Sequence, residues 1–134
     1  MGEISKTILT NMCMLYDGKG HYLVQKRLKK DWPGLNFPGG HVERYESLEA
    51  SVVREMKEET GLDVFELEQC GVFEWNVPEE NLRHVAILYR SCHYQGQLVS
   101  SAEGPMFWLT KEEMSSETQS QDFDRLFALM SRGL

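Results

Sequence analysis

Three glutamates stand close together near the middle of the sequence, at Glu55, Glu58 and Glu59. On an α-helix, which turns by about 100° per residue, they fall within an arc of about 100°. Like charges at this spacing destabilise a helix by roughly a few tenths of a kcal/mol per pair. Such a cluster is therefore either an acidic helix face kept in solvent or a set of ligands for a cation.

Apolar residues occupy the neighbouring arc of the same helix. Val52, Val53 and Met56 would form a buried stripe, so we expect the three acids to flank that stripe and to be partly buried. Two carboxylates about 4 Å apart repel by about 4 kcal/mol at an effective dielectric near 20, and a bound cation would offset this. Hard divalent ions such as Mg²⁺ take carboxylate and phosphate oxygens as ligands. The helix alone leaves the solvated acidic face as an equal alternative.

The wider spacing favours the metal site. Gly40, five residues, Glu46, seven residues and then residues 54–62 follow the pattern Gly-x5-Glu-x7-Arg-Glu-U-x-Glu-Glu-x-Gly-U, where U is bulky and apolar. At every defining position these residues resemble the Nudix box, with Met56 filling the apolar place. The box covers residues 40–62, and the order of strands and helices around it is similar to the Nudix fold over most of the chain.

This resemblance implies a loop–helix–loop motif that holds a divalent metal against a pyrophosphate linkage. Water then attacks phosphorus, and a nucleoside diphosphate joined to another group is cleaved. The metal would be Mg²⁺, with Mn²⁺ as the alternative, because metal ions neutralise a polyphosphate and lower the pKa of bound water. The chain would therefore be a nucleotide-binding pyrophosphatase.

Carried over residue by residue, the resemblance also implies roles. The implied metal ligands are Glu55, Glu58, Glu59 and the backbone carbonyl of Gly39 or Gly40. Glu46 and Arg54 would support these ligands. Glu103, five residues before Trp108, lies where MutT-like members carry a later acid. Glu103 is thus a candidate metal ligand or general base, and the alternative is that it is an ordinary loop carboxylate without a role in the site. For the general base, the other candidate is a glutamate of the box.

Three features bear on the substrate, and the first two precede the helix. Asn36 aligns with a position that contacts the purine in MutT-like enzymes acting on oxidised guanine nucleotides, and its amide can donate and accept at once. A simple turn residue is an equal alternative. Lys26 and Arg27 lead a basic cluster with Lys29 and Lys30, which we interpret as a phosphate seat. Arg27 is the first choice because MutT-like members commonly carry Arg there, whereas the two later lysines are expected to be solvated.

The leading hypothesis is a Mg²⁺-dependent hydrolase that converts a nucleoside triphosphate, such as the oxidised purine 8-oxo-dGTP, to a monophosphate and pyrophosphate. ADP-ribose or a nucleotide sugar is the alternative substrate, since Pro78 lies 16 residues past Leu62, a spacing seen in the ADP-ribose pyrophosphatase branch. A catalytically silent, nucleotide-binding module is the alternative from another class. Trp32, Phe73 and Trp75 are candidates for stacking on a base or for the core.

The elements that must position these residues follow from periodicity and turn chemistry. In order, they are an opening hairpin of strands at 7–16 and 21–27, a loop at 29–40, a helix at 47–60, strands at 62–75, 83–94 and 106–109, and a closing amphipathic helix at 121–132. Ser47 is the expected N-cap of the first helix and Gly61 its stop. This order predicts an α/β fold: a Nudix-type α/β/α sandwich on a mixed sheet, with 1–134 as a single domain.

Composition and charge narrow the partners. The 134 residues are 41% hydrophobic and 26% charged, which is typical of one globular domain. The net charge of −7 argues against duplex nucleic acid, because phosphate neutralisation needs a basic face. No apolar run reaches the roughly 18–20 residues of a membrane span, and no signal-peptide pattern opens the chain. We therefore expect a nucleotide as partner, no membrane, and a monomer or a homodimer.

The three cysteines, Cys13, Cys70 and Cys92, are widely spaced. They form no CxxC pair and no zinc spacing, so we interpret them as structural thiols in a reducing compartment, the cytoplasm.

Overall fold

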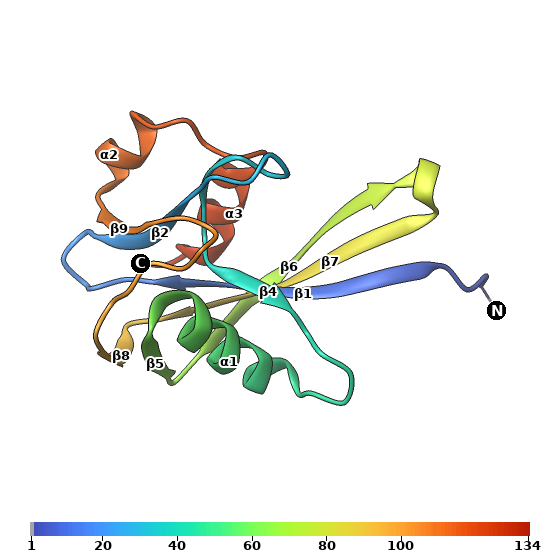
Figure 1. The fold of residues 1–134 in the computed structure, drawn as a ribbon, viewed down its shortest axis with the longest axis horizontal. Coiled ribbons are helices and arrows are strands. Elements are labelled where there is room, and N and C mark those ends of the chain that lie inside the picture. The colour runs from blue at the N-terminus through green and yellow to red at the C-terminus, as the bar shows by residue number, and fades with distance from the viewer. Residues whose placement is uncertain (1) are drawn as a thin grey trace.

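The longest strands form the central sheet of the molecule (Figure 1). In the computed structural model, which describes residues 2–134, this sheet has the order β4-β1-β7-β6. Its strands are β1 (Lys6–Leu15), β4 (Gly39–His41), β6 (Glu68–Val77) and β7 (Leu82–Ser91). β1 and β7 run parallel, whereas β4 and β6 are antiparallel to their neighbours. The sheet is therefore mixed, as predicted.

Two smaller sheets and three helices complete the fold. A three-stranded antiparallel sheet has β2 (Tyr22–Arg27) between β3 (Gly34–Asn36) and β9 (Met106–Leu109), and β5 (Leu62–Phe65) pairs with β8 (His93–Gly96). The helices are α1 (Leu48–Thr60), α2 (Lys111–Ser115) and α3 (Phe123–Met130), and a single 3-10 turn, η1, covers Pro78–Glu80. None of the helices within residues 2–134 is long and apolar enough to cross a membrane.

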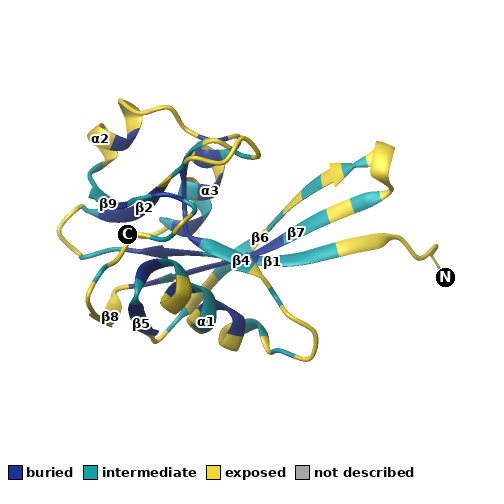
Figure 2. Cartoon of the chain, viewed as in Figure 1, coloured by how far each residue is buried: buried dark blue, intermediate teal, exposed yellow. Residues whose placement is uncertain are grey.

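The central sheet separates two hydrophobic cores. Cys13 and Leu15 of β1 pack on the side of α1, while Met14 between them packs on the side of α3. This follows from the alternation of strand side chains between the two faces of a sheet. With α1 on one face and α3 on the other (Figures 1 and 2), the structure confirms the predicted α/β/α sandwich.

Helix α1 begins and ends where its caps predict. The Ser47 hydroxyl accepts a hydrogen bond from the Ala50 amide, and Gly61 ends the helix in the left-handed conformation at φ 78°. The buried stripe is narrower than expected, because Val52 and Met56 are fully buried whereas Val53 is 40% exposed. The prediction was wrong for Val53, which lies about 100° around the helix from the buried Val52.

The opening hairpin was predicted wrongly. The turn at 17–20 forms, since the Asp17 carboxylate accepts hydrogen bonds from the amides of Lys19 and His21. However, β1 and β2 enter different sheets and share only the isolated bridge between Tyr16 and Tyr22. The predicted loop at 29–40 also differs, because it contributes β3 to the sheet of β2 and begins β4 beside β1.

Two predicted strands are each divided in the structure. The run at 62–75 breaks after β5, where Glu66 has φ 47°, and β6 continues from Glu68 to Val77. The run at 83–94 breaks at the end of β7, where the Ser91 hydroxyl donates to the carbonyl of Phe65 and accepts from the amide of His93. Helix α2 was not predicted; a capping box of Thr110 and Glu113 begins it.

The β6–β7 hairpin and the start of β1 project from the body of the molecule (Figure 1). Along this extension the strands are intermediate or exposed, in contrast to their buried central parts (Figure 2). Residues of β6 and β7 in this extension line one pocket together with residues of α1, so the extension forms one side of that pocket.

Candidate active site

Arg54 of α1 holds the acids of the motif together. Its guanidinium binds both oxygens of Glu46, with Nε 2.8 Å from Oε2 and Nη2 2.9 Å from Oε1. Nη1 donates to Glu55 at 2.8 Å and to Glu58 at 3.3 Å, and Nη2 donates to the carbonyl of His41 at 2.9 Å. Arg54 therefore binds Glu46, Glu55 and Glu58 at once. We call the residues Glu46, Arg54, Glu55, Glu58 and Glu59 the helix wall.

The acids of the helix wall differ in their electrostatics. The hydrogen bonds from Arg54 lower the pKa of Glu46 to about 2. Burial raises the pKa of Glu55, with a further rise from the charges of Glu58 and Glu59 that Arg54 partly opposes. Glu46 is thus a fixed anion, whereas Glu55 lies in surroundings that favour an additional positive charge.

The two glycines of β4 allow the backbone to approach this wall. A Cβ on Gly40 would lie 2.3 Å from the carboxyl carbon of Glu55, and one on Gly39 would lie 2.1 Å from the backbone oxygen of Asn11. The buried Asn11 side chain accepts from the Gly40 amide at 3.2 Å and donates to the Ser51 hydroxyl at 2.8 Å. Asn11 therefore joins β4 to α1 where Gly40 meets Glu55.

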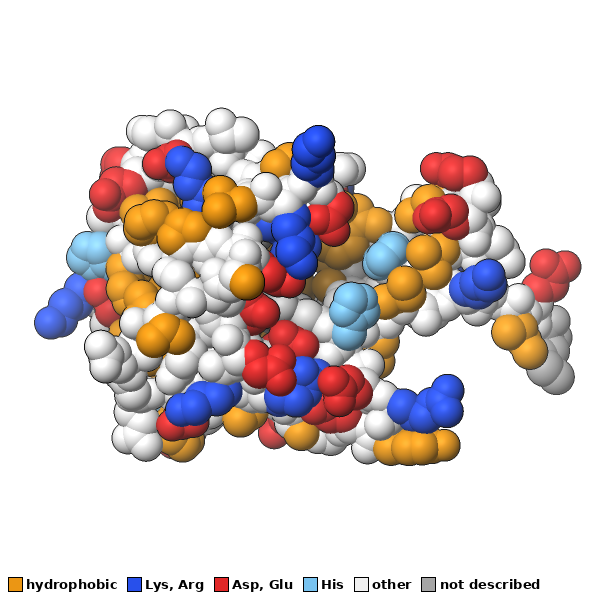
Figure 3. All heavy atoms as spheres, in the orientation of Figure 1, with side chains coloured by type: hydrophobic (Ala, Val, Ile, Leu, Met, Phe, Trp, Pro, Cys, Tyr) orange, Lys and Arg blue, Asp and Glu red, His pale blue; other side chains and the backbone are white. Residues whose placement is uncertain are grey.

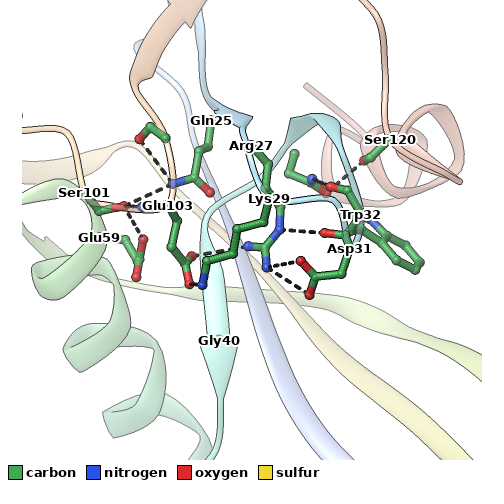
Figure 4. A network of polar contacts seen from close by, with 12 residues as sticks. Gln25, Arg27, Lys29, Asp31, Trp32, Gly40, Glu59, Ser101, Glu103 and Ser120 are labelled. Atoms are coloured by element: carbon green, nitrogen blue, oxygen red, sulfur yellow. Dashed lines mark hydrogen bonds and ion pairs between the residues drawn. The ribbon is translucent and has the colours of Figure 1, made fainter.

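Glu103 faces the helix wall from the loop at 97–105. Its carboxylate accepts from Arg27 Nη1 at 3.3 Å and from Lys29 Nζ at 3.3 Å, while Arg27 also donates to the carbonyl of Asp31 at 3.0 Å (Figure 4). Lys29 is 52% exposed at its side chain, as expected of a solvated lysine, and it also pairs with this acid. We call Gln25, Arg27, Lys29, Ser101 and Glu103 the loop wall.

Lys26 does not join the loop wall. Adjacent residues of a strand point to opposite faces, so Arg27 faces the pocket while Lys26 faces away and lies 3.8 Å from Glu117. Of these two residues predicted to contact phosphate, Arg27 therefore lines the pocket and Lys26 does not.

An aromatic end lies beyond the two walls. Trp32 and Trp75 meet edge to face with ring centroids 5.0 Å apart, and the Trp75 indole donates to Asp122 at 2.9 Å. Asn36 is buried, donating to the carbonyl of Trp32 at 2.9 Å and accepting from the Ser120 hydroxyl at 2.8 Å. One N–H and one lone pair of its amide are not used by these bonds.

These parts line one pocket of about 660 Å³, which is within the usual size of a small-molecule site. Glu55, Glu58, Glu59, Glu103 and Arg27 line it together with the aromatic end. Figure 3 shows acidic and basic side chains next to one another in the middle of this face of the molecule.

The donor set of the pocket fits a hard divalent ion, because carboxylate oxygens from two sides face one space. The close approach of Gly40 to Glu55, which a Cβ would prevent, fits a ligand cradle there. In residues 2–134 no three acidic, histidine or cysteine side chains already converge on one point. Glu55 and Glu58 are turned to Arg54 and must rotate to meet an ion, whereas Glu59 binds Ser101 through Oε2 and can meet an ion with Oε1 while that bond is kept.

Sequence reasoning missed several residues of the site. Asn11, Ser101, Ser120 and Asp122 each act through a hydrogen bond to a distant element. No local sequence pattern marks these four residues. The one available signal was Asn11, a polar residue inside the largely apolar run that forms β1.

A mixed sheet with a loop–helix–loop of this composition defines a Nudix-type hydrolase domain. The chain belongs to the Nudix family, since the family model of the NUDIX domain matches residues 7–129.

Among curated proteins, the chain is similar to the uncharacterized Nudix hydrolase YvcI of Bacillus subtilis, with 28% identity over 90% of this chain and 77% of that protein. It is also similar to the NAD-capped RNA hydrolase NudC of Mycobacterium tuberculosis, with 26% identity over 84% of this chain. The chain spans only 36% of the length of NudC.

Solved structures agree on the fold. The ORF135 protein of E. coli superposes with a TM-score of 0.80 at 24% identity, covering 97% of this chain and 94% of that one. The MutT protein of Methanosarcina mazei superposes with a TM-score of 0.79 at 24% identity, covering 98% and 97%. The neighbours thus include MutT proteins, and the fold fits the MutT-like branch.

Proposed function

We propose that this protein is a pyrophosphohydrolase that uses a divalent metal to convert a nucleoside triphosphate to a nucleoside monophosphate and pyrophosphate. The observation that carries the proposal is one pocket in which Glu55, Glu58 and Glu59 face Arg27 and Glu103, with an aromatic end beyond them. A triphosphate needs cations along its phosphates and a flat apolar surface for its base, and this pocket offers both.

We assign the ligand role to Glu55, Glu58 and Glu59, with the carbonyl of Gly39 or Gly40 and with Glu103 from the loop. Mg²⁺, or Mn²⁺ in its place, would supply charge neutralisation of the polyphosphate and acidification of water. Glu46 keeps Arg54 in place when Glu55 and Glu58 turn away from it, because its bond to the guanidinium is bidentate. Glu103 and the box glutamates are the candidates for the general base.

Arg27 and the aromatic end would orient the nucleotide. Arg27 is the strand cation that faces the pocket, so it is the proposed phosphate contact. The remaining N–H and lone pair of Asn36 suit the donor and acceptor edge of a purine, with Trp32 and Trp75 as the stacking surface. These features support an oxidised purine such as 8-oxo-dGTP as the preferred substrate.

The second candidate is cleavage of a diphosphate that joins two larger groups, such as ADP-ribose or a nucleotide sugar. The name of the NudC relative, which acts on NAD-capped RNA, favours this class. Pro78 gives it no support, because it lies in a separate hollow at the tip of the extension, beside Asn76 and Arg83.

We further propose that residues 1–134 act as one Nudix domain in the cytoplasm. The family match over 7–129 supports the single domain. Cys13, Cys70 and Cys92 are all free thiols, which supports a reducing compartment.

The test is product release from 8-oxo-dGTP, the common nucleoside triphosphates, ADP-ribose and NAD⁺, each with Mg²⁺, with Mn²⁺ and with chelator. We expect metal-dependent release of pyrophosphate, fastest from an oxidised purine triphosphate. Faster cleavage of ADP-ribose or NAD⁺ would replace the substrate class by the second candidate. Thermal stabilisation by nucleotide without any product would identify a silent binding module.

A further inference from the structure

Ser101 is the residue of the loop wall that reaches across to the helix wall (Figure 4). Its hydroxyl donates to Glu59 at 2.8 Å, and it accepts from the Gln25 side chain and from the backbone amide of Glu103, each at 3.2 Å. A hydroxyl has one hydrogen to donate and two lone pairs, so all its bonding capacity is used. The position of this oxygen is therefore set from three directions.

The loop that carries Ser101 is anchored to the body. The amides of Lys26 and Leu28 donate to the carbonyls of Pro105 and Glu103, at 3.0 and 3.1 Å. Gly104 lies so close to β2 that a Cβ there would come within 2.2 Å of the Lys26 carbonyl oxygen. Glu103 is thus held against β2 at its backbone.

Glu59, the acid on the opposite side of the pocket, is held through its side chain by Ser101. Glu59 is in the last turn of α1 and lines the pocket, and within residues 2–134 its side chain is hydrogen-bonded to Ser101 alone. Arg54 binds the other acids of the helix wall. The carboxylate of Glu59 is therefore oriented from the loop and not from its own helix.

We propose that Ser101 is a positioning residue that fixes Glu59 relative to Glu103, so that an acid of α1 and an acid of the loop serve the same divalent cation. This inference rests on the metal site proposed above. It explains why a small hydroxyl side chain stands where the helix wall and the loop wall meet.

The chain offers matched variants for the test. Ser101→Ala removes all three hydrogen bonds, whereas Ser101→Thr keeps the hydroxyl. Ser100→Ala changes the neighbouring serine, whose hydroxyl accepts, within residues 2–134, from the Met106 amide alone, at 3.4 Å. Gln25→Met removes the amide that holds Ser101 from β2 without changing either acid.

The measurement is Mn²⁺ binding in the absence of nucleotide, followed by the paramagnetic resonance signal of free Mn²⁺. We expect Ser101→Ala to weaken binding about 10-fold and Gln25→Met about 3-fold, because residues that orient metal ligands typically contribute 10- to 100-fold in affinity. Ser100→Ala should bind as the unmodified protein does, and Ser101→Thr should restore most of the loss.

Unchanged binding in Ser101→Ala, an equal loss in Ser100→Ala, or no restoration by threonine would each overturn the role of Ser101 while leaving the metal site in place. If the unmodified protein binds no Mn²⁺, the metal site itself fails, and this role with it. Where the protein cleaves a nucleotide, Ser101→Ala should lower kcat at limiting Mg²⁺ and leave the KM for the nucleotide unchanged.

Discussion

The two walls of the pocket are built in opposite ways. In the helix wall, the acids and Arg54 come from residues 46–59, and the guanidinium bonds to Glu46 and Glu55 are 2.8–2.9 Å long. In the loop wall, the contacts join residues 74–76 positions apart and are longer, at 3.3 Å between Glu103 and its two cations. Apart from Glu59, which Ser101 holds from the loop, the helix wall is a local unit bonded to Arg54, whereas the loop wall depends on the folding of distant segments. We infer that the reaction type is encoded locally and the choice of substrate non-locally.

Removing an acid of the helix wall should have the largest effect. Glu58→Gln is expected to lower turnover on the order of 10²- to 10³-fold, because metal assistance contributes several kcal/mol to the transition state. The fold should stay intact, since the Glu58 side chain is 57% exposed. Glu49→Gln, in the first turn of the same helix, is the control and should be fully active. Normal turnover by Glu58→Gln with normal Mn²⁺ binding would remove Glu58 from the metal site.

Substitution of the two glycines of β4 should distinguish residues needed for activity from residues needed for stability. Gly40→Ala would push against the Glu55 side chain, so we expect activity to fall about 10- to 100-fold with a small change in melting temperature. Gly39→Ala would push against the backbone of Asn11 and should lower the free energy of unfolding by about 1–3 kcal/mol. Denaturant unfolding and steady-state kinetics on both variants would test this division, and a reversed pattern would contradict it.

Removing the arginine of the loop wall should alter substrate binding more than turnover. Arg27→Ala is expected to raise the KM for a triphosphate about 10-fold or more, since a hydrogen bond to a charged group is worth about 1.5–3 kcal/mol. Lys26→Ala, one residue away on the opposite face of β2, is the matched control and should leave KM unchanged. An equal rise in both variants would mean that the cluster acts only through its overall charge.

At the aromatic end, Asn36→Ala should shift the preference among bases by roughly 3- to 10-fold, the range of one neutral hydrogen bond. Competition between 8-oxo-dGTP, dGTP and dCTP would measure it. Losses of equal size on every nucleotide would assign Asn36 to packing against Trp32 and Ser120 alone.

The smallest effect concerns the turn before α1. Tyr45 has φ 67° and is 98% exposed, so it adopts a strained backbone conformation without burying its ring. Tyr45→Gly should raise the free energy of unfolding by about 0.5–1 kcal/mol, because glycine adopts this conformation without steric cost. Tyr45→Ala keeps the Cβ and should give no gain. A loss of metal activation in Tyr45→Gly would instead indicate that the strain helps to set the helix wall.

The same contrast explains what the sequence could predict. Helix α1 was predicted almost to the residue, because Ser47 and Gly61 act on the backbone next to them. The strands β3 and β4 were not predicted, since three-residue strands form only by pairing with β2 and β1. Likewise, the family resemblance named Glu103, but its pairing with Lys29 and the link from Ser101 to Glu59 depend on tertiary contacts.

The parallel pairing of β1 with β7 has a consequence for how the chain reaches its native state. Lys6 lies beside Leu82 and Leu15 beside Ser91, so this pairing joins segments whose synthesis is separated by most of the chain. Contacts of such long sequence separation slow folding, because loop closure must precede any gain from the contact. During translation the whole acidic motif would leave the ribosome while one edge of β1 still lacks its partner. Until Ser91 has emerged, that edge is open to pairing with other chains, and early chaperone binding should protect it.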